Sequence, residues 1–360
     1  MNFAFVGHSG SSAFEWFAHG LLGAMIRKGH RRVANDGGAK LIFNFFPSER
    51  PRPFRRRAQA IFVCSVTDFP HPFTDHLTQG YHMVPRSLAN LVVGLVRNGQ
   101  GSPDAHFITP EQGHYVVPGE TEAESYFEDV YRRIRPMASS TLVIDNLFAP
   151  DLPGELWEGD EATRSIARAG RKLDEVDLLP APFPMDKLLS PRDFRHLKRL
   201  FGIGGLSYGN LSARLDGDSF WMSASGVDKS RLGRIGHDIL LVRGYDPERN
   251  GMIVSHPPGV TPRRVSVDAI EHWMIYGEHP SVGAILHVHG WMEGVRSTDF
   301  NYPCGTRELG QAVADIVRED DDPARCVVGL KNHGLTITGE SLDEIFDRVE
   351  GKILRTVPMG

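Results

Sequence analysis

Residues 279–289, HPSVGAILHVH, form the stretch that decides the fold of the carboxy-terminal half. The apolar run that begins at Gly283 is typical of a buried strand, and it ends in His287 and His289. Side chains two residues apart on a strand project from the same face, so both imidazoles can reach one cation. Two histidines at this spacing can also make ordinary hydrogen bonds, and the pair by itself leaves both interpretations open.

A third histidine follows another apolar run. In VVGLKNHG, residues 327–334, the strand predicted at 326–330 leads to His333. If this strand neighbours the first, His333 completes a site of three nitrogen ligands with an open position for substrate or water. Imidazole binds zinc, iron, nickel and cobalt, so the ligands do not determine the metal. The second strand that ends in a histidine favours the metal site.

An acidic residue close to such a site could transfer protons. The helix predicted at 267–276 precedes the strand with the histidine pair and contains Asp268, Glu271 and His272. A carboxylate near a bound cation keeps its charge and can act as a ligand or base. The alternative is a helix cap, in which Ser266 or Asp268 accepts hydrogen bonds from free amides and Glu271 favours the helix dipole. Taken alone, this segment favours the cap.

Two glycine-containing segments could bind an anion. Residues 209–214, GNLSAR, and residues 223–229, SASGVDK, supply turns, backbone amides and hydroxyls. Such groups can hold anionic oxygens, as glycine loops do in phosphate sites. Ordinary turns have the same composition, so each segment alone favours a turn.

The length of 360 residues exceeds the usual size of one hydrophobic core and predicts two domains. In the first half, short apolar runs alternate with amphipathic stretches, which predicts an open, mostly parallel, Rossmann-like α/β sheet over residues 1–150. A proline-rich linker with one helix is expected at 151–183, followed by a second domain at 184–360.

The individual elements follow from the apolar spacing. In the first half, strands are predicted at 3–6, 41–46, 61–66 and 141–144, and helices at 13–27, 88–97, 122–134 and 161–175. In the second half, strands are predicted at 220–223, 239–242, 283–289 and 326–330, and helices at 191–201, 267–276, 309–317 and 342–354.

The composition excludes several classes of protein. A formal net charge of -5 gives no general attraction for nucleic acid, and the arginines between 50 and 57 are interpreted as a solvated surface loop. The sequence contains no membrane-spanning apolar run and no export signal. Three cysteines without a CxxC pair argue against a disulfide framework, so a cytoplasmic protein is expected.

The amino terminus contains a possible second anion site. Residues 5–12, FVGHSGSS, resemble a strand, a glycine turn and the start of a helix, where an anion could bind near His8 and Ser9. The full GxGxxG spacing is absent, which favours a packing turn over a nucleotide site. This half of the chain resembles no family that we recognise.

In the second half, five segments in chain order resemble the signature segments of the class II aldolase and adducin family. They are GNLSAR (209–214), SASGVDKSRL (223–232), HPSVGAILHVH (279–289), PCGTREL (303–309) and LKNHGLTITG (330–339). The family includes fuculose-phosphate and rhamnulose-phosphate aldolases, ribulose-phosphate epimerase and methylthioribulose-phosphate dehydratase. The resemblance covers residues 184–360 and implies a three-layer α/β/α domain that binds a divalent metal, with zinc favoured.

The resemblance also implies roles for individual residues. His287, His289 and His333 would hold the metal. Asp268 would move the proton, and Tyr302 is a candidate catalytic group. The residues that would contact the substrate or its phosphate are Asn210, Ser225, Gly226 and Ser266.

The sequence departs from the family pattern at several positions. Asp268 stands where the aldolases and the dehydratase have glutamate, and Val267 replaces a phosphate-binding hydroxyl. The segment between His289 and the helix at 309–317 is short, so Tyr302 has no certain counterpart. These departures put a standard sugar-phosphate aldolase in question but leave the metal ligands intact.

The resemblance therefore implies a metal-dependent lyase of carbohydrate metabolism. The leading hypothesis is retro-aldol cleavage of a small sugar, phosphosugar or other hydroxy-carbonyl compound through a metal-stabilised enediolate. A dehydratase or decarboxylase on the same scaffold is the first alternative, and a non-catalytic, adducin-like binding protein is the second. Relatives form fourfold assemblies, so a homotetramer is expected, with a dimer as the alternative.

Overall fold

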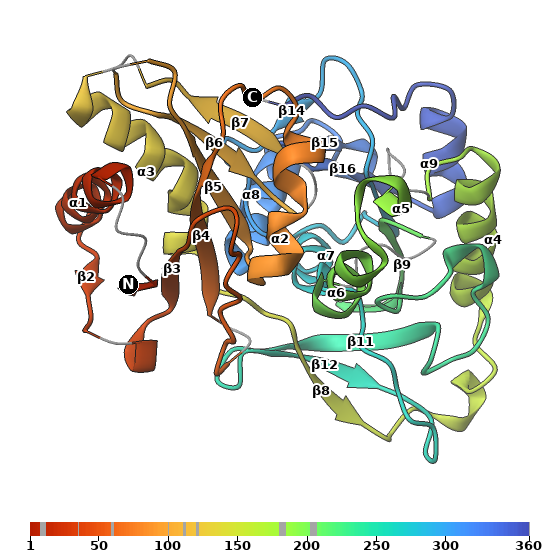
Figure 1. The fold of residues 1–360 in the computed structure, drawn as a ribbon. Helices are drawn as coiled ribbons and strands as arrows, with labels where there is room; N and C mark the ends of the chain where they lie inside the picture. The colour runs from red at the N-terminus through yellow and green to blue at the C-terminus, as the bar shows by residue number, and fades with distance from the viewer. Residues whose placement is uncertain are drawn as a thin grey trace. The chain divides into compact units, whose positions relative to one another are not determined.

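The computed structural model describes residues 1–7, 12–34, 36–58, 61–99, 101–110, 113–119, 122–179, 185–201 and 207–359. The chain folds into two compact units (Figure 1). Unit 1 contains Met1–Ser140, Met185–Phe201 and Met359–Gly360, and unit 2 contains Thr141–Pro184 and Gly202–Pro358. Each unit has one mixed sheet and several helices, so the protein is of the α/β class.

The sheet of unit 1 has the strand order β2-β1-β3-β4-β5-β6-β7. The strands are β1 (Asn2–Gly7), β2 (Arg31–Arg32), β3 (Leu41–Phe45), β4 (Phe62–Phe69), β5 (Leu91–Val96), β6 (Asp104–Ile108) and β7 (His114–Val117). The first five strands in this order run parallel, and β6 and β7 add antiparallel pairs. All residues of β3 and β5 are buried, as expected for a parallel sheet covered on both faces.

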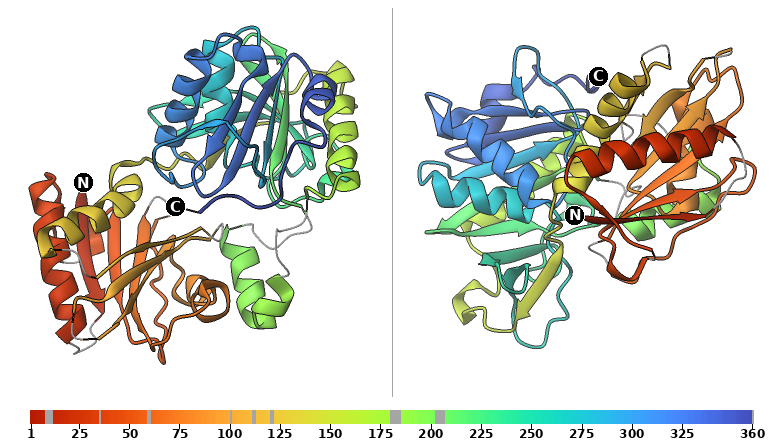
Figure 2. Two further views of the ribbon diagram at one scale, coloured as in Figure 1. Left: turned by 90° about the horizontal axis from the view of Figure 1, so that it is seen from above. Right: turned by 90° about the vertical axis from the view of Figure 1, so that its left-hand side faces the viewer.

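Helices cover both faces of this sheet (Figure 2). Helices α1 (Ser12–Arg27) and α3 (Ala123–Ser139) pack together on one face, where the rings of Trp16 and Phe127 lie 4.9 Å apart. On the other face lie α2 (Met83–Ser87) and α6 (Pro191–Phe201), joined by an ion pair of 2.8 Å between Arg86 and the buried Asp193. A π-helix (Leu77–Tyr81) and the short α5 (Met185–Leu188) complete this face.

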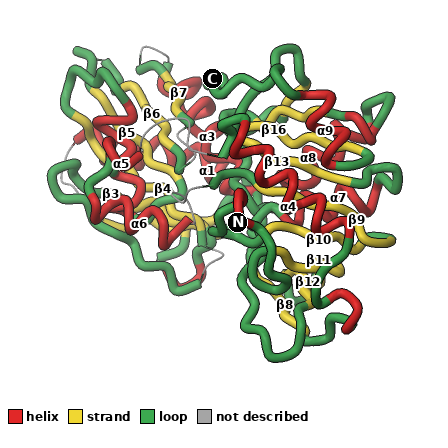
Figure 3. Tube along the Cα trace, turned by 90° about the vertical axis from the view of Figure 1, so that its right-hand side faces the viewer, coloured by secondary structure: helices red, strands yellow, loops and turns green. Residues whose placement is uncertain are grey.

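The sheet of unit 2 has nine strands in the order β14-β15-β16-β13-β9-β10-β11-β12-β8, most of which can be followed in Figure 3. They are β8 (Asp145–Ala149), β9 (Asn210–Asp216), β10 (Ser219–Ser223), β11 (Ile239–Asp246), β12 (Gly251–Ser255), β13 (Ala284–Val288), β14 (Arg296–Ser297), β15 (Val327–Leu330) and β16 (Gly334–Gly339). All neighbouring pairs are antiparallel except β8 with β12 and β14 with β15.

Two helical layers enclose the sheet of unit 2 (Figure 2). Helices α4 (Glu161–Glu175) and α9 (Leu342–Val349) lie on one face, and α7 (Ala269–Glu278) and α8 (Arg307–Arg318) lie on the other. Side chains cap three of these helices, because Asp160, Thr306 and Ser341 each accept a hydrogen bond from a first-turn amide. Short 3-10 turns lie at Gly154–Leu156, Lys229–Arg231 and Pro323–Arg325 in this unit, and at Asp36–Gly38 in unit 1.

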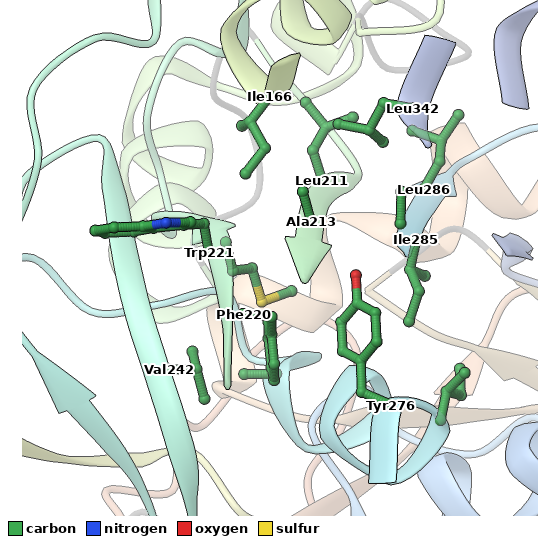
Figure 4. Packing of buried hydrophobic residues seen from close by; sticks show 14 of the residues in the cluster. Ile166, Leu211, Ala213, Phe220, Trp221, Val242, Tyr276, Ile285, Leu286 and Leu342 are labelled. Carbon is green, nitrogen blue, oxygen red and sulfur yellow. The ribbon is translucent and has the colours of Figure 1, made fainter. Parts of the chain in front are cut away.

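The core of unit 2 lies between the sheet and its helices. Phe220, Trp221 and Leu286 are fully buried in it, and the Trp221 indole donates a hydrogen bond of 2.9 Å to Asp160 at the start of α4. Figure 4 shows Tyr276 of α7 with its hydroxyl directed toward the strand that carries Ala213, where the Ser212 hydroxyl lies 2.8 Å away. These contacts attach both helical layers to the central strands.

Two sequence predictions differ from the structure. The helix predicted at 88–97 is wrong, since Leu91–Val96 is the fully buried strand β5. Its continuous apolar run fits a strand buried on both faces as well as it fits a helix. The strand predicted at 141–144 lies instead at Asp145–Ala149 and pairs with β12 in unit 2.

The contacts also group two segments differently from the predicted ranges. Residues 151–179, predicted as a linker, belong to unit 2, where α4 packs on β9 and β10. Helix α6, predicted as the start of the second domain, belongs to unit 1 through its contacts with α2. The predicted anion site at His8 and Ser9 lies outside the described residues. Within the described ranges, none of the helices has the length and apolar character needed to cross a membrane.

Candidate metal and acid–base centre

The centre of the site is a row of polar residues across three neighbouring strands. His287 on β13 is paired with Asn210 on β9 and with Thr336 on β16. Residues directly opposite each other in a sheet present their side chains on the same face. The three side chains therefore lie side by side on the face that α7 covers, which Asn210 and Thr336 both contact.

Two glycines allow other backbone segments to approach the ends of this row. A Cβ atom on Gly209 would lie 2.2 Å from the carbonyl oxygen of His287, and one on Gly334 would lie 2.2 Å from that of Val288. Gly209 also has a positive φ of 70°. Only glycine satisfies these requirements without a shift of the backbone. The absence of a side chain at both positions therefore lets the neighbouring backbone pack directly against the strand that carries His287.

Three histidines converge at the end of β13. His289 follows the strand, and His333 lies in the turn between β15 and β16, next to Asn332 with its positive φ of 57°. The Nε2 atoms of His289 and His333 are 3.1 Å apart, and the ring centroid of His287 lies 4.8 Å from that of His333. One nitrogen from each ring lies within 4.8 Å of the other two. The structure thus brings the three predicted metal ligands together.

The surroundings of His287 fit a metal ligand. Its Nδ1 lies 3.0 Å from the carbonyl oxygen of Leu335, which can only accept a hydrogen bond, so Nδ1 carries the proton. Its Nε2 therefore has a free lone pair, is buried, and has no hydrogen-bond partner among the described residues. A backbone carbonyl that holds the second ring nitrogen is the usual support of a metal-bound histidine.

The protonation of the three rings also fits a cation. Burial lowers the pKa of His287, and burial together with the charges of neighbouring histidines holds the pKa of His289 and His333 well below the usual range. Neutral imidazoles are the form that binds a metal. Three such ligands with one open position are typical of catalytic zinc sites, although the ligand set also suits other divalent metals.

Asp268 lies at the N-cap of α7, but its side chain does not cap the helix. Its Oδ2 instead accepts a hydrogen bond of 2.8 Å from the Asn210 amide, and its Oδ1 is buried without a partner among the described residues. The cap that the sequence favoured is thus not formed by this side chain. Burial lowers the pKa of His287, and the nearby charge of Asp268 partly opposes that shift.

Glu271 lies one turn along α7 and is only 1% exposed. Its Oε1 accepts a hydrogen bond of 2.5 Å from the Thr336 hydroxyl, whereas Oε2 is buried without a partner among the described residues. Burial and the negative charge of Asp268 raise the pKa of Glu271 above the ordinary carboxyl range. A second carboxyl group therefore lies beside the predicted acid.

A buried cation lies near the same centre. Lys229 is 3% exposed, and its Nζ donates hydrogen bonds of 3.1 and 3.4 Å to the carbonyl and hydroxyl oxygens of Ser207. Burial lowers its pKa to about 8, against the opposing effect of Asp228 and Asp268. Lys229 thus adds positive charge within electrostatic reach of Asp268.

The residues predicted to contact phosphate fall into two groups. Ser225 and Gly226 are adjacent to the segment of Ser266, because Ala224 and Val265 form a β-bridge and the Ser225 amide donates to the Arg264 carbonyl at 2.8 Å. Gly226 is exposed and Ser225 and Ser266 are half-buried, so a ligand can reach them. Asn210 is separate from this group, since it is 1% exposed and its amide is bonded to Asp268.

Tyr302, the candidate catalytic tyrosine, is half-buried on the segment that precedes α8. Two residues later, the sulfur of Cys304 lies 3.7 Å from Nε2 of His333. The structure therefore places this segment beside the histidines through Cys304, a residue that the sequence did not single out.

Sequence reasoning missed the contributions of Thr336 and Lys229, and it named Glu271 only as a further acid on the helix of Asp268. Thr336 and Thr338 are polar residues that alternate within a completely buried strand, a pattern that marks them as hydrogen-bonded. Lys229 belongs to the SASGVDK segment but lacks any local signal of burial. The functional interest of Glu271 depends on Thr336, which is 65 residues away in sequence.

The sequence is similar to known proteins. The family model described as "Class II Aldolase and Adducin N-terminal domain" matches residues 194–298. A methylthioribulose-1-phosphate dehydratase from Leptospira biflexa is 28% identical over 159 residues, which cover 41% of this chain and 71% of that protein.

Solved structures give further matches. L-fuculose 1-phosphate aldolase matches with a TM-score of 0.37 and 19% identity, covering 55% of this chain and 84% of that chain. An aldolase II superfamily protein from Pseudomonas syringae matches with a TM-score of 0.37 and 16% identity, covering 55% of this chain and 73% of that chain.

Proposed function

Since the chain carries a class II aldolase and adducin domain over residues 194–298, we propose that it is a metal-dependent lyase. Its substrate would be a small hydroxy-carbonyl compound, with a phosphorylated sugar favoured. The observation that supports this proposal most directly is the cluster of His287, His289 and His333, in which the buried Nε2 of His287 has no partner among the described residues. Asp268 lies within electrostatic reach of the same cluster.

The three histidines would hold one divalent cation, with zinc favoured. A bound cation would polarise the carbonyl group of the substrate and stabilise the negative charge that develops on its oxygen. The rigid sheet register fixes His287, and the Leu335 carbonyl fixes the ring orientation that directs Nε2 toward the cation. The burial of His287 and His333 restricts water at these two ligands.

Asp268 would transfer the proton. Its Oδ2 is held by the Asn210 amide, while Oδ1 remains available for a proton that is exchanged with the substrate. In this proposal Asn210 orients the acid, and a contact between Asn210 and phosphate stays a prediction. Ser225, Gly226 and Ser266 would bind the anionic end of the substrate with their amides and hydroxyls.

Two lyase reactions are compatible with these residues. In a retro-aldol cleavage, a carbon–carbon bond breaks, a hydroxyl proton is lost, and the carbon beside the carbonyl group gains a proton. In a dehydration, the proton beside the carbonyl group is removed and the hydroxyl group leaves as water. The similarity to the Leptospira biflexa dehydratase supports the second reaction as an alternative.

Metal content is the first measurement. We expect about one equivalent of zinc or a similar metal per chain in the native protein, and its loss in His287→Ala and His333→Ala. His19→Ala, a change of an exposed histidine on α1, should keep the metal and serves as the control. A native protein that binds no metal after reconstitution would support the adducin-like binding protein instead.

Product analysis then separates the two reactions. The metal-loaded protein is incubated with L-fuculose 1-phosphate and with methylthioribulose 1-phosphate as probes. Two carbonyl fragments indicate cleavage, and a single product that has lost water indicates dehydration. We also propose that the protein forms a homo-oligomer, expected as a tetramer. Sedimentation analysis measures this oligomeric state.

A further inference from the structure

The polar row around His287 holds two carboxyl groups. Asn210, on one side of His287, donates to Asp268, and Thr336, on the other side, donates to Glu271. Both acids belong to the same end of α7. The strands β9 and β16 thus fix one carboxyl group each on either side of a metal ligand.

In each of the two carboxyl groups, one oxygen accepts a hydrogen bond and the other oxygen does not. Asp268 Oδ1 and Glu271 Oε2 are buried, and each has no hydrogen-bond partner within the described part of the chain. A buried carboxylate oxygen without a donor is unfavourable, because it has lost its water and gained nothing in return. A proton held between the two groups would satisfy one oxygen of each.

The charges around the pair support this arrangement. Two carboxylates that share a buried site resist double ionisation, and Glu271 is affected by the charge of Asp268. Lys229 and His287 interact electrostatically with Asp268, and of these two only Lys229 is a cation when the imidazole is neutral. Burial and Asp268 raise the pKa of Glu271.

We propose that Asp268 and Glu271 work as one proton-transferring unit, in which Glu271 exchanges a proton with Asp268 and only Asp268 meets the substrate. This inference rests on the proposed lyase function. Glu271 acts through Asp268, so it is a positioning residue for the proton and not itself a catalytic residue. A single carboxyl group, in one protonation state, can either donate a proton or accept one. A pair of carboxyl groups that holds one proton can do both.

The proton balance fits both candidate reactions. In cleavage, the pair gives its proton to the carbon that loses its bond partner, and it regains the proton that the substrate hydroxyl group loses, so the pair ends with the same number of protons. In dehydration, the carbon–hydrogen bond beside the carbonyl group breaks and its proton enters the pair. One proton then leaves the pair with the departing hydroxyl group as water.

Infrared spectroscopy of the metal-loaded protein tests the pair without a substrate. At neutral pH we expect a carbonyl stretch of a protonated carboxyl group, which shifts in D2O, disappears in Glu271→Gln, and shifts in Asp268→Asn. Glu344→Gln is the matched control, because Glu344 also has one bonded and one unpartnered buried oxygen but forms ion pairs with Arg325 and Arg348. This control should leave the band unchanged.

The proposal is overturned if the native protein lacks the band, or if Asp268→Asn leaves its frequency unchanged. The second result would make Glu271 an isolated structural acid. Glutamine keeps the size of Glu271 and can still accept from Thr336, so the variant should fold and keep its metal content. A protein that shows the coupled band but binds no metal would retain the pair and refute the lyase.

Turnover of the probe that the native protein converts gives a second test. Glutamine imitates a permanently protonated carboxyl group, so an inert structural acid predicts an unchanged rate and pH profile for Glu271→Gln. Proton exchange predicts a rate lower by on the order of 10²-fold and a changed pH profile. An unchanged rate and profile would refute the role of Glu271.

Discussion

We expect acid to destabilise unit 1 because three imidazoles lie together on β6, β7 and the adjoining π-helix. Nδ1 of His106 lies 3.0 Å from Nε2 of His114, and the ring of His76 stacks on that of His114 with centroids 4.2 Å apart. Burial, and then the positive charges of His76 and His106, lower the pKa of His114 to about 4. Protonation of one ring therefore opposes protonation of the next.

The sign of the effect follows from proton binding. The unfolded chain protonates this histidine below about pH 6.5, whereas the folded chain does so only near pH 4. The unfolded state binds more protons in this window, so the free energy of unfolding falls as the pH decreases through it. At 1.36 kcal/mol per pKa unit the shift corresponds to about 3 kcal/mol, and solvent screening of this half-buried group reduces it to about 1–2 kcal/mol.

Urea unfolding at about pH 7 and about pH 4.5, compared between the native protein and His114→Gln, measures this contribution. Glutamine does not titrate, so the variant should lose about 1–2 kcal/mol less stability on acidification than the native protein. The exposed His19→Gln should behave like the native protein. Equal losses in the native protein and in His114→Gln would refute the reasoning.

Two further substitutions or modifications have defined outcomes. Gly209→Ala should lower the free energy of unfolding by about 1–3 kcal/mol and reduce metal content, because its Cβ would lie 2.2 Å from the His287 carbonyl oxygen. Gly259 has a similar positive φ but open space around it, so Gly259→Ala measures the cost of the backbone conformation without the steric contact. In peptide mapping after iodoacetamide treatment, Cys304 should react faster than the buried Cys326, and bound metal should slow the reaction by restraining the adjacent histidine. Equal labelling with and without metal would contradict the second expectation.

Local sequence patterns were sufficient to predict much of unit 2. The predicted strand at 283–289 and the predicted helix at 267–276 overlap β13 and α7, because a short apolar run and a helical spacing are both local signals. The convergence of His287, His289 and His333 was predicted on the condition that the strand at 326–330 neighbours β13. In the structure β16 lies between these two strands, and His333 reaches the site from the turn between β15 and β16. The family resemblance supplied the set of three ligands but not the order of the strands.

The remainder depended on long-range contacts that no local pattern records. The pairing of Thr336 with Glu271 requires the register of β16 beside β13 and the position of α7 over both. The burial of Lys229 requires the contact with Ser207. In unit 1, the run from Leu91 to Val96 could be assigned to a strand only once its neighbours on both sides of the sheet were known.

The interleaved course of the chain limits how the protein can be dissected. Strand β8 and helix α4 belong to unit 2 but precede α6, which belongs to unit 1, so neither unit is a continuous fragment. A recombinant fragment that began at residue 194 would start inside α6 and would lack both the edge strand that pairs with β12 and the helix that covers β9 and β10. Exchange of a complete unit between proteins would therefore need matched junctions at several points of the chain.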